Sequence, residues 1–222
     1  MNVFPVRMVL VVLLGALAAG CSSMEYKIRE SFGQQKREIL VDRVGAAKDS
    51  QEEAKAQFLT ALEQFKSVTG FEGGDLEARY DSLKKEFDRC NSRAEDVHKR
   101  IDAVEDVAHA LFREWEDELK EYTSENLRQL SQRQLEQTRL SYESLISVMH
   151  KAEDRMDPVL ASFKDQVLFL KHNLNARAIS SLGGVSADLQ RDIDRLVADM
   201  ERAIADASAF IDSMQTPPAN GS

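Results

Sequence analysis

The strongest constraint on the fold is a stripe of apolar residues that recurs every three or four positions over residues 76–122. Neither glycine nor proline interrupts this stretch. Such spacing places the apolar side chains on one face of a helix, and a face of this length has to be covered by partner helices. The stripe therefore predicts long helices packed side by side, with Trp115 in the core because it belongs to the stripe.

Three further helices are predicted from weaker stripes of the same period. The first covers residues 26–68, with an interruption near Gly33 as the alternative. The next covers residues 132–182, where Pro158 is expected to kink the helix because it removes a backbone donor and crowds the preceding turn. The last begins after Ser186, whose side chain can cap it.

Short turns are expected between these helices. Gly70–Asp75 is the clearest, because glycines tolerate the positive φ that ends a helix. Gly183–Gly184 is expected to end the third helix in the same way. A further turn is expected within residues 122–132, where the stripe loses register and Ser131 fits a capping box. A continuous helix with a stutter is the alternative there.

These elements predict an all-α fold with a single domain. Short turns between long helices imply antiparallel neighbours, and ten glycines and four prolines in 222 residues leave helices long. The expected architecture is an elongated antiparallel helical bundle, or coiled coil, of three to four long helices. It would cover residues 26–214 and leave a disordered tail over residues 215–222.

The N-terminal twenty residues are typical of a secretory signal peptide. Arg7 is the only charged side chain before Glu25, and an apolar block with a small-residue exit follows it. The block is shorter than the roughly 20 apolar residues that a membrane-spanning helix needs. Its exit, Leu17–Cys21, resembles a bacterial lipobox, which predicts removal of residues 1–20 and acylation of Cys21, palmitate included. An ordinary secreted protein is the alternative.

The lipid on Cys21 predicts a membrane partner and a location in the cell envelope. Ser22 follows the cysteine, and by resemblance to enteric-type lipoproteins this residue directs the protein to the inner leaflet of the outer membrane, facing the periplasm. The formal net charge of −9 repels nucleic acid and anionic head groups, so nucleic acid is not expected as a partner. Residues 21–25 would serve as the anchor.

With Cys21 acylated, Cys90 has no second cysteine with which to form an internal disulfide. Because it falls within the apolar stripe, we expect a buried, inert thiol. A redox-active or intermolecular thiol is the alternative, although no CxxC motif accompanies it.

Residues that could carry chemistry are scattered. Glu95/His98 and Asp106/His109 resemble the acid-x-x-His pairs of di-iron bundles, but on one helix they lie about 16 Å apart, too far to share a metal cluster. We expect both histidines to be partly exposed. The acidic cluster is expected to form a solvated helix face; its members are Glu114, Glu116, Asp117, Glu118 and Glu121. No phosphate-binding loop, nucleophile motif or zinc spacing occurs, so neither enzymatic activity, a cofactor nor a metal is expected.

The segment 163–176 is the best candidate for binding. Val167 to Leu170 are four consecutive apolar residues, which surround a helix instead of forming one stripe. One interpretation is a helix buried between two neighbours. The other is a docking surface for another protein or a second copy, formed by Leu168, Phe169, Lys171, His172 and Asn173.

Three stretches carry a family resemblance: residues 36–44 (KREILVDRV), 71–77 (FEGGDLE) and 165–176 (DQVLFLKHNLNA). They resemble an uncharacterised family of proteobacterial lipoproteins, known as a domain of unknown function with the number 2959. The resemblance implies a helical lipoprotein and no particular activity. The sequence thus predicts a lipid-tethered, non-enzymatic protein that binds, spaces or adapts an envelope partner. A self-associating structural coiled coil is the alternative, and a metal- or ligand-binding bundle is the third.

Overall fold

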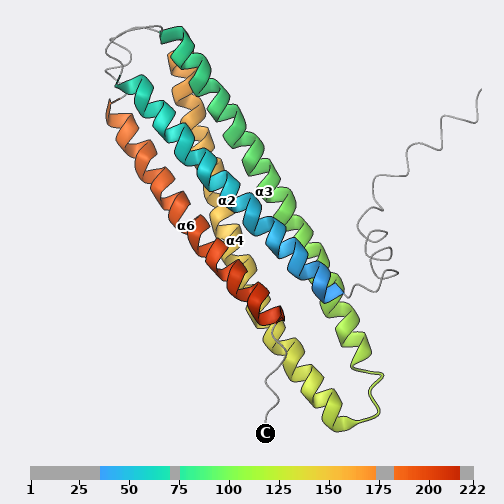
Figure 1. Cartoon of the computed structure of the whole chain (residues 1–222). Coiled ribbons are helices and arrows are strands. Elements are labelled where there is room, and N and C mark those ends of the chain that lie inside the picture. Colours follow the sequence, from blue (N-terminus) through green and yellow to red (C-terminus); the bar gives the residue numbers. More distant parts are fainter. Residues whose placement is uncertain (1–35, 71–75, 174–182, 216–222) are drawn as a thin grey trace, which may run out of the picture.

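The computed structural model describes residues 36–70, 76–173 and 183–215. Over these residues the chain forms four helices and no strand: α2 (Lys36–Thr69), α3 (Leu76–Glu118), α4 (Glu125–His172) and α6 (Gly183–Gln215). They run antiparallel to their chain neighbours in one elongated bundle (Figure 1). The predicted all-α antiparallel bundle is confirmed. The predicted signal peptide, Cys21, residues 26–35 and the tail from residue 216 lie outside the described residues.

Each helix packs against two others. α2 contacts α3 and α6, and α4 contacts the same two helices, so the order around the bundle is α2, α3, α4, α6. The core contains an aromatic cluster in which Phe163 meets Phe65 and Phe87 edge to face, with ring centroids 6.1 and 5.6 Å apart. Phe65 and Phe163 are fully buried. Burial of each such ring contributes roughly 1.5–3 kcal/mol, which makes this cluster a main source of bundle stability.

Most of the stripe on α3 is buried as predicted up to Leu111, with Leu76 and Phe87 half-buried, and it becomes uncovered beyond that point. Leu83 and Ile101 are fully buried, whereas Trp115 is half-buried and Tyr122, past the end of the helix, is exposed. Among the described residues, no helix is both long and apolar enough to span a membrane.

Cys90 is fully buried, as predicted. Its Sγ lies 3.6 Å from the backbone oxygen of Gln57, and burial raises the pKa of the thiol to about 12. The thiolate that would react is therefore strongly disfavoured at neutral pH.

The second turn lies earlier than the sequence indicated. Residues 119–124 connect α3 to α4, so the predicted helix start at residue 132 is wrong, and so is the continuous-helix alternative. Ser124 is the N-cap: its backbone is extended, and its hydroxyl accepts a hydrogen bond from the Leu127 amide at 3.4 Å. Ser131 lies inside α4, where its hydroxyl accepts a bond from Trp115 Nε1 at 2.8 Å.

The third turn also differs from the prediction. α4 passes through Pro158 without a break and ends at His172, ten residues before the predicted end. Asn173 leaves the helical conformation, and its backbone N–H and side-chain amide donate to the carbonyls of Leu170 and Phe169. Gly183 and Gly184 begin α6, so they do not end α4. Asn173 therefore ends α4, the role that the sequence assigned to Gly183 and Gly184.

Candidate functional site

Polar side chains gather along the contact between α3 and α4, which we call the α3–α4 seam. α3 contributes His98 and Glu105, and α4 contributes His150, Glu153 and Asp157. These positions recur at helical spacing, so each side chain reaches across to the facing helix. The result is an ionisable cluster beside an otherwise apolar core.

Glu153 is the centre of the cluster. It is only 9% exposed, and its two carboxylate oxygens face the Nδ1 atoms of His98 and His150, the latter at 2.6 Å. A buried carboxylate is costly unless it is paired and hydrogen-bonded. Two imidazole donors from two helices meet that requirement, and they join α3 to α4 through one side chain.

His150 is held between two carboxylates. Its Nδ1 faces Glu153, and its Nε2 lies 3.1 Å from Glu105 Oε1. Carboxylates only accept hydrogen bonds, so both ring nitrogens carry a proton when both bonds form. Burial by itself lowers the pKa of His150, but the hydrogen bonds to Glu153 and Glu105 outweigh it and raise this pKa above its usual 6.5. The arrangement favours the charged imidazolium.

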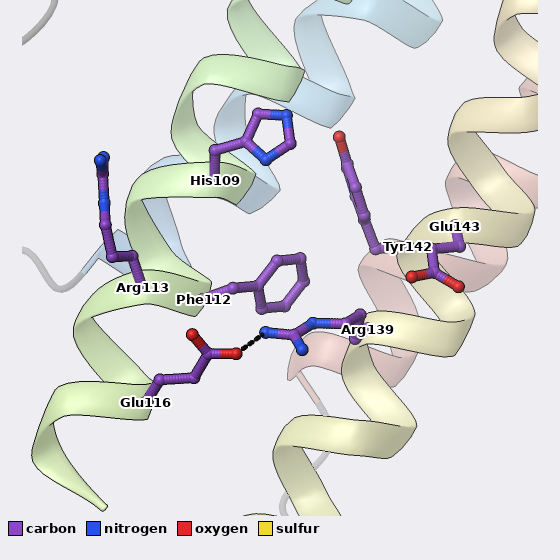
Figure 2. Close-up of a pocket in the computed structure, with 7 residues that line it drawn as sticks. All are labelled: His109, Phe112, Arg113, Glu116, Arg139, Tyr142 and Glu143. Atoms are coloured by element: carbon purple, nitrogen blue, oxygen red, sulfur yellow. Dashed lines mark hydrogen bonds and ion pairs between the residues drawn. The ribbon is translucent and has the colours of Figure 1, made fainter.

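A groove of about 550 Å³ continues the seam toward the start of α4. Figure 2 shows His109 and Phe112 of α3 and Tyr142 of α4 pointing into it. Arg139 lies over the Phe112 ring, 5.1 Å from its centroid, and donates to Glu116 at 2.6 Å. An aromatic floor and a fixed guanidinium give the groove both apolar and polar contacts.

Tyr142 is the unusual residue of the groove. It is 5% exposed, and its hydroxyl has no hydrogen-bond partner among the described residues. Burial raises its pKa to about 12, so the hydroxyl stays protonated at neutral pH. Its ring packs against Phe112 with centroids 5.4 Å apart. An unpartnered buried hydroxyl is destabilising, because its hydrogen bonds to water are lost without replacement.

The seam consists of imidazole and carboxylate groups in direct contact. In the described parts of the chain, no group of three or more His, Cys, Asp or Glu side chains is arranged to bind a metal ion. The short contacts join imidazole nitrogens directly to carboxylate oxygens, which is the geometry of hydrogen-bonded ion pairs. The arrangement can therefore bind and release protons across a helix–helix contact.

A second buried ion pair links α4 to α6. Asp199 of α6 is 7% exposed and accepts from Lys151 at 2.8 Å and from Arg155 at 2.5 Å. Burial by itself raises the pKa of Asp199, but the two basic partners outweigh it and lower this pKa below its usual 3.8. α4 is thus held by buried carboxylates on both of its neighbouring sides.

The segment 163–176 is divided between the core and the surface. Val167 and Leu170 are buried, whereas Leu168 and Phe169 are 45% and 39% exposed. The interpretation that neighbours cover this helix on several sides is therefore wrong for residues 167–170. Lys171 and His172 are also exposed, and Asn173 is half-buried in its capping role. Docking at these residues remains a prediction, and Cys21 lies outside the described residues.

Among the residues that form the seam, the sequence pattern singles out His98 alone, in a pair with Glu95. In the structure Glu95 accepts from Asn91 at 3.1 Å, while His98 contacts Glu153 on another helix. A signal was present: Glu153 stands between Ala152 and Met156 in the buried stripe of α4. A carboxylate at a core position requires a partner, although the sequence does not say which one.

The acidic cluster lies on an exposed face, as predicted. Glu114 pairs with Lys36 at 2.7 Å and Asp117 with Lys120 at 2.7 Å. Surface pairs of this kind contribute little to stability.

Residues 25–214 match the family described as "Protein of unknown function (DUF2959)". The matched region contains all four described helices, together with the α3–α4 seam and its groove. No curated protein and no solved structure matches the chain. Because the match extends over most of the sequence and agrees with the three stretches noted above, the chain belongs to the DUF2959 family of proteins of unknown function.

Proposed function

We propose that this chain is a lipid-anchored protein of the bacterial cell envelope with a non-enzymatic role in binding, spacing or adapting a partner. Acyl chains on Cys21 hold it to the inner leaflet of the outer membrane, and the bundle faces the periplasm. The apolar block before Cys21, the small residues at its end and Ser22 after it support this location.

One observation carries the binding role: an exposed apolar pair lies at the opposite end of the bundle from Lys36, the first described residue after the proposed anchor. α2 begins at Lys36, fifteen residues after Cys21, and its 34 residues extend about 50 Å. Leu168 and Phe169 lie near the far end, where α2 and α4 both finish (Figure 1). A tether at one end and a contact surface at the other describe a spacer.

Cross-linking in intact cells tests this role. A photoreactive residue at position 169 is compared with one at position 59, because Leu59 is also 39% exposed but lies within α2. We expect one envelope protein to be captured from position 169 and not from position 59. Capture should be lost in the Leu168→Asp variant.

The anchor is tested separately by the Cys21→Ser variant. We expect the wild-type protein to fractionate with outer membranes and to incorporate labelled palmitate, and the variant to do neither. Labelling and fractionation unchanged in Cys21→Ser would contradict the anchor. Equal capture from positions 59 and 169 would contradict the binding role.

A self-associating structural protein is the second candidate. Leu140 is 67% exposed, the highest value among the large apolar side chains of the described residues. A second copy could cover it. Light scattering over a wide concentration range separates the candidates, because a mass that stays monomeric excludes self-association.

A further inference from the structure

The α3–α4 hairpin projects beyond the other two helices (Figure 1). Lys36, the first residue of α2, pairs with Glu114 close to the end of α3. Ser213, near the end of α6, lines the same pocket as Ser141 of α4. The part of α4 that precedes Ser141 therefore extends roughly 20 Å past the end of α6.

The core-facing side of the hairpin remains apolar where no described helix covers it. Trp115 on α3 and Leu119, just past the end of that helix, continue the buried stripe and are only half-buried. On α4, Leu127 precedes Leu145 by eighteen residues, which is about five full turns, so both lie on the same face of the helix. Leu145 is 2% exposed beside α6, and Leu127 is 53% exposed. Leu130, close to Leu127, is 48% exposed.

The register between α2 and α3 indicates which part of the chain could lie beside the core-facing side of the hairpin. α2 runs antiparallel to α3, and Lys36 is beside Glu114, so a backward continuation of the α2 axis from Lys36 would lead toward the C-terminal end of α3. On such an axis, at 1.5 Å per residue, position 32 would be level with Glu118, the last residue of α3, and position 28 would lie about 6 Å beyond it. The Trp115–Ser131 hydrogen bond sets Leu127 and Leu130 beside this stretch.

The sequence before Lys36 has the matching chemistry. The family match begins at residue 25, eleven residues before α2, so this segment belongs to the family domain. Ile28 and Phe32 are four residues apart, the spacing that places two side chains on one helical face. Lys27 and Arg29 flank Ile28, and Glu25 and Glu30 balance their charge, so residues 25–35 carry no net charge.

We propose that residues 25–35 of the same chain dock on the core-facing side of the α3–α4 hairpin, with Ile28 and Phe32 covering Trp115, Leu127 and Leu130. Register and charge together decide between the candidate occupants. A second hairpin would bring its own acidic cluster against this one, and an anionic membrane surface would also be repelled. The segment carries no net charge, so it meets no such repulsion, and it directly precedes the helix that lies beside this face.

Trp115 provides the test, because it is the only tryptophan in the chain. The chain from residue 21 onward, with Cys21→Ser, contains the whole family match and can be studied without lipid. In the Ile28→Asp/Phe32→Asp variant we expect a red shift of the Trp115 emission and a larger acrylamide quenching constant. Gln34→Asp is the matched control, since it adds a charge on another face of the segment and should leave Trp115 unchanged.

Disulfide formation gives a second measurement that does not depend on destabilising the segment. The Ile28→Cys/Leu127→Cys variant should form an intramolecular disulfide, whereas Gln34→Cys/Leu127→Cys should not. Cys90 does not interfere because it is fully buried. Circular dichroism confirms that each variant retains its helices.

Three results would overturn the proposal. The first is a Trp115 emission that does not respond to Ile28→Asp/Phe32→Asp, together with no intramolecular disulfide. The second is a disulfide that forms only between chains, which assigns the face to a second copy. The third is shielding of Trp115 that requires phosphatidylglycerol vesicles, which assigns it to a membrane surface.

Discussion

His150 donates through Nδ1 to the carboxylate of Glu153, 2.6 Å away and one turn further along α4. Its other ring nitrogen faces Glu105 on α3, so protonation of one imidazole affects the contact between two helices. The α3–α4 seam is therefore expected to respond to pH.

The first prediction concerns this response. The pKa of His150 is raised in the folded state, so its stabilising contribution is complete below the unfolded pKa, near 6.5, and is lost as pH rises through the folded pKa. The side chain is 39% exposed, so solvent screens the interaction and we expect a difference below about 1 kcal/mol. Urea unfolding of wild type and His150→Gln should differ more at pH 5.5 than at pH 8.5.

His172→Gln is the control for that comparison, because His172 is exposed at the end of α4. Its unfolding free energy should follow the wild-type pH dependence. If His150→Gln also followed it throughout, the charged seam would have no role in stability.

The second prediction concerns the ion pair between α4 and α6. Asp199→Asn leaves Lys151 and Arg155 without their buried acceptor, and we expect a loss of about 1–2 kcal/mol at pH 7. Because the folded pKa of Asp199 is lowered, its contribution is present above the unfolded pKa, near 4, and is lost as pH falls through the folded pKa. The difference between wild type and variant should therefore shrink in acid. Asp188→Asn, which alters an exposed pair with Arg191, should change little.

The third prediction concerns the aromatic cluster. Phe163→Ala removes the ring that meets both Phe65 and Phe87, and the cavity left in a fully buried site should cost about 3–5 kcal/mol. Phe169→Ala, six residues further along the same helix, changes an exposed ring and should cost far less. Guanidinium unfolding of both variants makes the comparison. Equal losses would mean that Phe169 is buried in solution.

The fourth prediction concerns Tyr142. Tyr142→Phe removes a buried hydroxyl that has no partner, so stability should stay the same or rise by up to about 1 kcal/mol. Tyr122→Phe, at an exposed position, should be neutral. Thermal unfolding measures both. A clear loss of stability in Tyr142→Phe would show that the hydroxyl is hydrogen-bonded in solution.

The apolar period predicted the helices well and their ends poorly. Residues of the α3 stripe are buried because a spacing of three and four specifies one face, and Leu83, Ile101 and Leu111 all lie on it. Helix ends depend on single capping contacts. Ser131 fits a capping box in sequence, yet Ser124 caps α4, and the hydroxyl of Ser131 accepts a hydrogen bond from Trp115 inside that helix.

The seam was less predictable than the core because it depends on residues distant in sequence. His98 and Glu153 are separated by 55 positions, and their contact depends on the register of two antiparallel helices. Phe169 shows a related limit. The apolar run 167–170 is evident in the sequence, but the burial of each residue depends on the helices that neighbour α4. For that reason Leu170 is buried and Phe169 is exposed.

The two ends of the described bundle are tied to each other. The carbonyl of Met214, in the last turn of α6, has no partner further along its own helix, and it accepts two hydrogen bonds from Arg37 in the first turn of α2, at 2.9 and 3.1 Å. The start of α2 and the end of α6 are therefore expected to fray together, because fraying of either one breaks these hydrogen bonds. The two ends are close enough for circular permutation. A short peptide that joins the end of α6 to the start of α2 would leave the core intact. A permuted chain of the same fold could then start in the turn at residues 119–124.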